Sequence, residues 1–172
     1  MHHCVASRIL LFPRIMANVY LGLGTNLGDR KKNITNATII IGSVMGEIRQ
    51  LSSLYTSEPW GFQSENNFLN AVVLIETEHS PETCLQMAKS IEREMGRTYH
   101  KTGEYEDRII DIDILLYDNL IIDSESLKIP HPLIQERLFV LNPLAELAPE
   151  FVHPVLGKSI QELRDKLLEL NS

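Results

Sequence analysis

The clearest hydrophobic pattern in the chain is the alternation of apolar and acidic residues at 108–117. At the two-residue period of a β-strand, the apolar side chains fall on one face, which holds Ile110, Ile112, Ile114 and Leu116. Asp111 and Asp113 then lie together on the opposite face, roughly 6.6 Å apart along the strand. The pattern therefore predicts a half-buried strand that carries two neighbouring carboxylates.

Two like charges on a half-buried face are costly unless a positive group joins them. No Lys or Arg lies between Asp111 and Asp113 or directly after them, so a divalent cation is the natural candidate. The alternative interpretation is a polar, solvated face of an antiparallel sheet. The Ile and Leu residues that flank the pair argue against a wet face, and Arg108 lies three positions ahead. The pattern favours a metal site.

Similar periodicities predict the other elements. Further strands are expected at 18–24, 48–55, 68–76, 120–122 and 127–129. Helices are expected after Asp29, after Ser80-Pro81 and after the capping box Ser159-Ile-Gln-Glu162, with short turns between prolines over 130–150. The last helix should bury Ile160, Leu163, Leu167 and Leu170. The order β-α-β-β-α-β indicates an α+β sandwich of ferredoxin-like type, with helices packed on a mostly antiparallel sheet and a C-terminal helical tail.

The glycines at the end of the first strand invite comparison with nucleotide-binding loops. Gly22, Gly24 and Gly28 do not match the dinucleotide fingerprint, because Leu27 stands where G-x-G-x-x-G needs its third glycine. No phosphate-binding P-loop motif occurs either. We expect a tight turn before the helix, and if the protein handles phosphates it does so with side chains and metal.

Three further residues have both a structural and a functional interpretation. Trp60, on the polar loop 57–67, either packs into the core or contacts a ligand. Asn70 shares a strand face with Phe68 and Val72 and needs hydrogen-bond partners, from the backbone or from a ligand. His131 lies between two prolines, where surface or capping roles are common. Glu92, on the second helix, would ordinarily be solvated.

Composition narrows the class of protein. The 172 residues are 44% hydrophobic and 23% charged, which is typical of a folded domain. The net charge of −7 argues against a nucleic-acid binder, although local arginines can still hold a small anion. Cys4 and Cys84 form no metal or disulfide pattern, so a reduced, cytoplasmic setting is expected. No stretch predicts a membrane span or a signal peptide. We expect residues 1–15 to be a disordered extension and 16–172 to be one domain.

Four motifs occur in order along the chain. They are Leu-Gly-Leu-Gly24-Thr-Asn26-Leu-Gly28, Phe68-Leu-Asn70-Ala, Arg108-Ile-Ile-Asp111-Ile-Asp113-Ile-Leu, and Pro130-His131-Pro132 followed by Arg137-Leu-Phe139-Val-Leu-x-Pro143-Leu. Together they resemble the 6-hydroxymethyl-7,8-dihydropterin pyrophosphokinase family of folate biosynthesis. The resemblance runs from about Ala17 through Phe151. It implies a magnesium- and ATP-dependent enzyme that transfers pyrophosphate from ATP to the hydroxymethyl group of the pterin and releases AMP.

The resemblance also implies roles for individual residues. The two aspartates would hold two Mg²⁺ ions, and the catalytic set would be Asp111, Asp113, Arg108 and Arg97. ATP would contact Glu92, Arg108, Ile114, His131 and Arg137. The pterin would be sandwiched between Phe68 and Phe139, and its other contacts would be Ser57, Pro59, Trp60, Asn70 and Tyr105. We expect a monomer whose only partners are these small substrates, with no nucleic acid and no membrane.

The chain departs from the family pattern before the two-aspartate strand. Tyr105-Glu-Asp107-Arg108 stands where many members have Trp-Gly-Pro-Arg, and Tyr99 and Glu104 stand where arginines are common. Lys101 is a candidate for part of the missing positive charge. Two other functions fit the same residues: a non-catalytic ferredoxin-like module that binds pterin or nucleotide, and a nucleotidyl transferase, which would release pyrophosphate instead of AMP.

Overall fold

A computed structural model describes residues 15–98 and 106–171 of the chain. The elements, in order, are β1 (Ala17–Thr25), α1 (Arg30–Val44), β2 (Glu47–Leu51), β3 (Tyr55–Ser57), β4 (Phe68–Thr77), α2 (Pro81–Glu94), β5 (Asp111–Tyr117), β6 (Ile122–Asp123), β7 (Lys128–Ile129), the 3-10 turn η1 (Ile134–Glu136), α3 (Leu138–Leu147) and α4 (Ile160–Leu170). The expected extension at 1–15 and the candidate contacts Lys101 and Tyr105 lie outside the described residues, apart from Ile15. No described helix is long and apolar enough to cross a bilayer.

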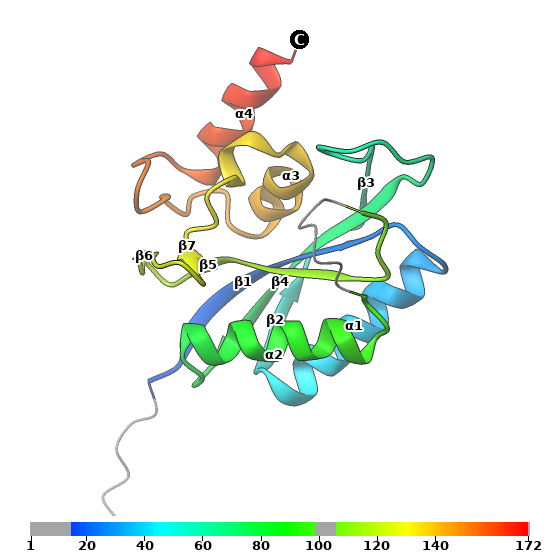
Figure 1. Ribbon diagram of the computed structural model, residues 1–172. Coiled ribbons are helices and arrows are strands. Elements are labelled where there is room, and N and C mark those ends of the chain that lie inside the picture. The colour runs from blue at the N-terminus through cyan, green and yellow to red at the C-terminus, as the bar shows by residue number, and fades with distance from the viewer. Residues whose placement is uncertain (1–14, 99–105, 172) are drawn as a thin grey trace, which may run out of the picture.

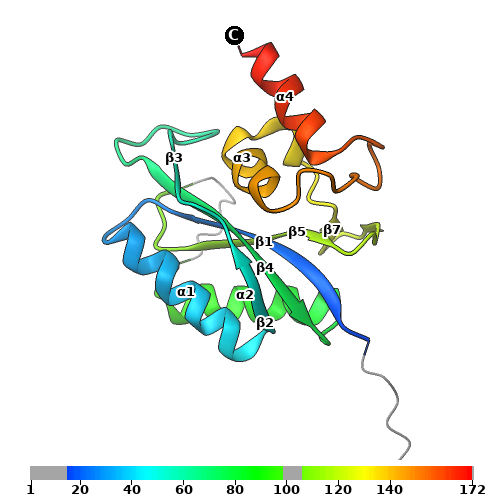
Figure 2. The same cartoon turned by 180° about the vertical axis from the view of Figure 1, so that it is seen from behind.

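The main sheet is antiparallel throughout, with strand order β2-β4-β1-β5 and with β3 paired to β4 beyond the end of β2. Helices α1 and α2 cover one face, while α3 and α4 lie on the other side of the sheet (Figures 1 and 2). The predicted ferredoxin-like α+β architecture is confirmed. Because both faces are covered, β4 is apolar along almost its whole length instead of alternating.

The predicted helix starts are confirmed by their caps. The Asp29 side chain accepts a hydrogen bond from the Lys32 N–H at 3.0 Å, and Ser80 caps α2 directly before a proline at its first position. Ser159 and Glu162 form the reciprocal capping box of α4. Local sequence therefore decides where these three helices begin.

Two predictions about helices are wrong. Residues 138–147 form the continuous helix α3 in place of short turns, although Pro143 lies inside it. Pro143 and its neighbours Leu141 and Leu144 are buried, and packing of α3 against α4 and β4 offsets the lost backbone hydrogen bond. Leu170, expected to face inward, is 72% exposed because α4 extends past the body of the molecule at that end (Figure 1).

Two predicted strands also differ from the pattern. The strand expected at 48–55 is split into β2 and β3, and between them the Ser52 hydroxyl accepts the hydrogen bond from the Val72 N–H at 2.9 Å. In β5 a bulge shifts the register, so that Tyr20 pairs with Leu116 and Leu21 pairs with Ile114. Leu116 therefore packs on the α3 side and not with the isoleucines.

Candidate active site

The site lies on the α3 side of the sheet, where two cross-strand rows place different side chains around glycines. One row runs Asn70–Gly24–Asp111 and the other runs Val72–Gly22–Asp113 across β4, β1 and β5. The even residues of β4 and, ahead of the bulge, Asp111 and Asp113 of β5 point to this face, as the period of two predicted. The central strand thus contributes no side chain between the amide and the two carboxylates.

The expectation of a tight turn is correct only for Gly28. Gly28 has φ of +64° in the connection to α1, whereas Gly22 and Gly24 are inside β1. A Cβ on Gly24 would lie 3.4 Å from Asn70 Oδ1 and 3.7 Å from the Phe68 ring. Because these two glycines have no side chain, the floor of a pocket remains open above them.

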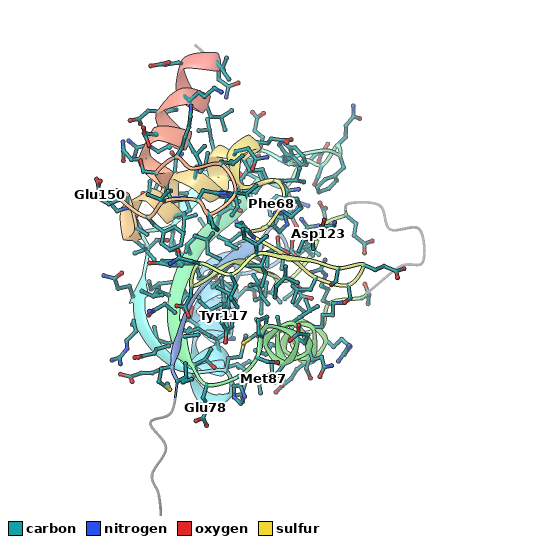
Figure 3. All side chains as sticks on the ribbon, turned by 90° about the vertical axis from the view of Figure 1, so that its left-hand side faces the viewer. Phe68, Glu78, Met87, Tyr117, Asp123 and Glu150 are labelled. Carbon is teal, nitrogen blue, oxygen red and sulfur yellow. The ribbon has the colours of Figure 1, made fainter. Side chains whose placement is uncertain are left out.

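That pocket, here the central pocket, brings together most of the predicted pterin and phosphate residues. Its lining includes Gly22, Gly24, Ser57, Trp60, Phe62, Phe68, Asn70, Arg108, Asp111, Asp113, Leu115, Arg137 and Phe139. Phe68, labelled in Figure 3, lies on the side of the sheet that faces α3, whereas Met87 lies on α2 at the opposite face. Phe62, which sequence reasoning did not select, packs edge-on against Phe68 with ring centroids 6.1 Å apart. In the sequence, the signal for Phe62 is its position in the polar loop 57–67, two residues after Trp60.

Asn70 is held so that its oxygen faces the central pocket. Its amide nitrogen donates to the Ser57 hydroxyl at 2.9 Å and to the Tyr55 carbonyl at 3.2 Å. Its Oδ1 therefore remains as an acceptor beside Gly24, and the Ser57 hydroxyl keeps a proton to donate. The polar edge of this pocket offers one acceptor and one donor side by side.

Helix α3 is fixed above the pocket by Glu146. This carboxylate accepts hydrogen bonds from the Ser53 N–H at 2.9 Å, from the Ser53 hydroxyl at 3.0 Å and from the Tyr55 hydroxyl at 2.8 Å. At the other end of α3, the buried Arg137 guanidinium lies 4.3 Å from the centre of the Trp60 ring and 5.7 Å from that of Phe139. The roof of the pocket is thus aromatic and positively charged.

A second pocket, here the edge pocket, lies along the outer edge of β5. It is lined by Leu85, Ile112, Asp113, Ile114, Glu125, Ser126, Leu127, Lys128, His131 and Pro132. Asp113 lines both pockets, so the two meet at that residue. Of the residues expected to contact ATP, Ile114 and His131 are here, and Arg108 and Arg137 are in the central pocket.

His131 is held as a neutral imidazole with a defined tautomer. Burial, then the nearby Arg137 charge, lowers its pKa to about 4, although Asp111 acts in the opposite direction. Its Nδ1 accepts a hydrogen bond from the Leu133 N–H at 3.2 Å, so the ring proton is on Nε2. At neutral pH His131 can therefore donate a hydrogen bond from Nε2 without carrying charge.

The two aspartates have different surroundings, which the sequence did not reveal. Asp111 pairs with Arg108, whose Nε lies 3.2 Å from Oδ2, and its Oδ1 accepts a hydrogen bond from Arg97. Arg97 Nη1 also lies 2.5 Å from Glu92. Two arginines thus partly balance Asp111 in the metal-free protein, since Arg108 folds back from three positions ahead and Arg97 follows the end of α2.

Glu92 is buried, contrary to the expectation of a solvated helix residue. Its Oε1 accepts a hydrogen bond from the Ile112 N–H at 2.7 Å as well as from Arg97. Glu92, Arg97 and Pro59 line neither pocket. Glu92 and Arg97 instead support the strand that carries the aspartates, since both contact residues 111–112 directly.

The Asp113 side chain makes no hydrogen bond or ion pair within residues 15–98 and 106–171. Its pKa is raised to about 7, chiefly by burial and then by the Asp111 charge and by Glu92, which together outweigh the opposing arginines Arg137 and Arg108. The described residues contain no cluster of three or more His, Cys, Asp or Glu side chains that could hold a metal. The protein thus offers a two-carboxylate donor set, which fits Mg²⁺ when substrate phosphate and water complete its coordination.

We expect Asp113→Asn to raise the free energy of unfolding of the metal-free protein at pH 8 by about 1–2 kcal/mol, since it removes an unbalanced charge. In the wild type the native pKa of Asp113 exceeds the unfolded value. Its native state therefore keeps a proton that the unfolded chain has lost between pH 4 and 7, and stability falls as pH rises through that window. In Asp113→Asn, the free energy of unfolding should not decrease over this pH range.

The matched control for that measurement is Asp111→Asn. It removes two ion pairs and should lower the free energy of unfolding by a similar amount. Urea unfolding at pH 5 and pH 8, with chelator present, measures both variants. Equal destabilisation by the two substitutions would contradict the different surroundings described for the two aspartates.

Comparison with known proteins identifies the family. The family model for 7,8-dihydro-6-hydroxymethylpterin-pyrophosphokinase (HPPK) matches residues 20–149. The chain belongs to the HPPK family. It is 40% identical to the 2-amino-4-hydroxy-6-hydroxymethyldihydropteridine pyrophosphokinase of Aquifex aeolicus over 149 residues, covering 87% of this chain and 91% of the relative. It is 45% identical to the Porphyromonas gingivalis enzyme of the same name over 141 residues, covering 81% of this chain and 95% of the relative.

Some HPPK relatives are much longer. The folic acid synthesis protein fol1 of Schizosaccharomyces pombe is 43% identical over 149 residues, which cover 86% of this chain but 20% of that protein. Among solved structures, wild-type HPPK-DHPS of Plasmodium falciparum superposes with a TM-score of 0.73 at 18% identity, over 90% of this chain and 45% of that chain. This structural likeness supports the HPPK fold, and the chain spans less than half of that protein.

Proposed function

We propose that this HPPK-family chain transfers pyrophosphate from ATP to the hydroxyl of 6-hydroxymethyl-7,8-dihydropterin, giving AMP and the pterin diphosphate in folate biosynthesis. The observation that carries the proposal is the position of Asp113, a carboxylate shared by two pockets of different chemistry. Family membership supports the same reaction. The two pockets would hold the two substrates, and the reacting groups would meet at Asp113.

The central pocket suits a flat, polar-edged heterocycle. Phe68 and Phe139 supply apolar ring surface, and Asn70 and Ser57 supply an acceptor and a donor for the pterin edge. Trp60, which is 38% exposed, would cover the outer side. Pro59 and Tyr105 are further proposed pterin contacts.

The edge pocket suits a nucleotide. Ile114 and Leu127 would lie against the adenine, and the neutral His131 would donate from Nε2 to ATP. Arg108 and Arg137, at the junction of the pockets, would bind phosphate oxygens, where guanidinium groups make charge-assisted hydrogen bonds. Glu92 and Arg97 would act on ATP through the positions of Ile112 and Asp111.

Asp111 and Asp113 are the proposed ligands of two Mg²⁺ ions that enter with ATP. When bound, these ions would neutralise phosphate charge and favour departure of AMP. The protein aligns the pterin hydroxyl oxygen with the β-phosphorus. The new O–Pβ bond forms as the bond from Pβ to the α,β-bridging oxygen breaks, that oxygen leaves with AMP, and the hydroxyl proton is released. Positioning should dominate the rate, because the protein forms no covalent bond.

AMP release from magnesium ATP tests this function. With the hydroxymethyl-dihydropterin present, we expect stoichiometric AMP and pterin diphosphate, and no AMP when the pterin is omitted or when chelator removes the magnesium. Tight binding of both substrates without turnover would indicate a non-catalytic module, and release of pyrophosphate would indicate a nucleotidyl transferase. We also propose that the enzyme acts as a cytoplasmic monomer, which sedimentation at working concentration tests.

A further inference from the structure

Three polar side chains outside both pockets connect the parts of the site. Asn26 Nδ2 donates to Asp107 Oδ1 at 2.7 Å, and Asn66 Nδ2 donates to Asp107 Oδ2 at 2.9 Å. Asn26 Nδ2 also lies 3.2 Å from the Asn66 carbonyl oxygen. We call Asn26, Asn66 and Asp107 the clasp. None of the three lines the central pocket or the edge pocket.

The clasp joins three segments that are far apart in the sequence. Asn26 follows β1 directly, Asn66 lies two residues before Phe68, and Asp107 precedes Arg108. Each segment therefore leads within a few residues to a group in the central pocket. The clasp thus links the backbone that leads to Phe68 with the backbone that leads to Arg108, whose Cζ lies 5.0 Å from the centre of the Phe68 ring.

Asn26 is the buried centre of this arrangement, with 4% of its surface exposed. Its Oδ1 accepts a hydrogen bond from the Arg108 N–H at 2.8 Å, and its own N–H donates to the Arg108 carbonyl at 3.1 Å. The Oδ1 and the backbone N–H of Asn26 therefore both hold the backbone ahead of β5, while its Nδ2 is used by Asp107 and by the Asn66 carbonyl. Arg30, on α1, holds the segment that contains Asn66, because it donates a hydrogen bond to the Asn67 carbonyl at 2.6 Å.

The Asp107 carboxylate is maintained in its charged form. The hydrogen bond from Ser64 has the largest effect and lowers its pKa; burial opposes it, and the hydrogen bonds from Asn66 and Asn26 lower the pKa further. A charged acceptor makes stronger hydrogen bonds than a neutral one, so the bonds of Asp107 are the strongest of the clasp.

We propose that Asn26, Asn66 and Asp107 are positioning residues that hold the pterin-side ring and the phosphate-side arginine in register for the transfer. The proposal rests on the proposed function of the same site. Because the clasp touches neither pocket, its loss should misalign two bound substrates more than it weakens the binding of either one. Misalignment by an ångström or less is enough to lower a rate by one to two orders of magnitude.

Substitutions at Asn66 and Asp107 separate the hydrogen bonds from other effects. Asp107→Ala removes the shared acceptor, and Asn66→Asp places a second carboxylate against it. We expect each to lower kcat at saturating substrates by about 10- to 100-fold, with the Kd for pterin alone changed by less than about threefold. Asp107→Asn should stay within about threefold of wild type, because its amide oxygen still accepts from Asn26 and its amide nitrogen donates to a turned-over Asn66.

The exchanged pair Asn66→Asp with Asp107→Asn is the rescue. It restores a carboxylate facing an amide in reversed order, so kcat should return to within about fivefold of wild type. Asn67→Ala is the matched control: it changes the adjacent asparagine, whose side chain makes no hydrogen bond to any residue of 15–98 or 106–171 while its carbonyl accepts from Arg30, and it should leave kcat unchanged. A role confined to stability would change the melting temperature without changing kcat per folded molecule.

The result that would overturn the proposal is a normal kcat in Asp107→Ala, or an exchanged pair no better than Asn66→Asp alone. The clasp can also be measured without turnover, so its failure is distinct from failure of the proposed function. Calorimetry gives the Kd for the dihydropterin with and without a non-hydrolysable ATP analogue. We expect the analogue to tighten pterin binding in the wild type, and this coupling to shrink toward none in Asn66→Asp.

Discussion

Asp113→Ala should lower kcat by at least about 10³-fold while the Kd for the pterin alone stays within about threefold of wild type. Asp113 is the carboxylate shared by the central and edge pockets, and it makes no ion pair within the described part of the chain. Its charge is therefore available for the metal that accompanies ATP. Steady-state AMP formation and calorimetric binding of pterin measure the two quantities.

The control for this prediction is Asp165→Ala, which removes a half-exposed carboxylate on α4 that lines neither pocket. It should leave turnover unchanged. A near-normal rate in Asp113→Ala would contradict the proposal that Asp113 is a metal ligand. It would also contradict the proposal that the two substrates meet at this residue. Added manganese should not restore the Ala variant, because the substitution deletes a ligand and does not merely weaken one.

Asn70→Ala should raise KM for the pterin by about 100-fold, with little change in KM for ATP. The amide of Asn70 is held by Ser57 and by the Tyr55 carbonyl, so that its Oδ1 faces the central pocket over Gly24. Removing it deletes the acceptor for the pterin edge and releases the Ser57 hydroxyl. When a buried hydrogen-bonding partner is left unpaired, the loss of binding free energy exceeds the contribution of one hydrogen bond.

Asn70→Asp is the sharper variant of the same test. A carboxylate keeps the acceptor but cannot donate to the Tyr55 carbonyl or to Ser57, so pterin binding should fall at least as far as in the Ala variant. Asn36→Ala, at an exposed position on α1, is the control. If Asn70→Ala changed KM for ATP and not for the pterin, the assignment of the two substrates to the two pockets would be reversed.

Much of the fold could be predicted because local sequence carries the deciding physics. The side chains of the caps Asp29, Ser80 and Ser159 each accept a hydrogen bond from one free N–H group of the first helical turn, whatever the helix packs against. Period-two alternation placed Phe68 and Asn70 on one face and Asp111 and Asp113 on one face, and both pairs line the central pocket. The family motifs reinforced these placements.

The electrostatics of the site could not be predicted in the same way. The sequence shows that Asp111 and Asp113 are neighbours, but it does not show that Arg97 reaches Asp111 from the end of α2. The burial of Glu92 depends on the Ile112 N–H, which lies on another element. Such contacts cross between elements, and their energies depend on burial that only packing decides.

Local sequence was enough to predict where α1, α2 and α4 begin, the alternation that brings the two aspartates to one face and, through its motifs, the family. Only the folded chain shows that Gly22 and Gly24 form a pocket floor, that a bulge moves Leu116 to the opposite side, and that Asn26, Asn66 and Asp107 meet. The physical reason is range: caps and strand periodicity depend on residues a few positions apart. Register, burial and cross-loop hydrogen bonds depend on segments that meet only when the sheet is assembled.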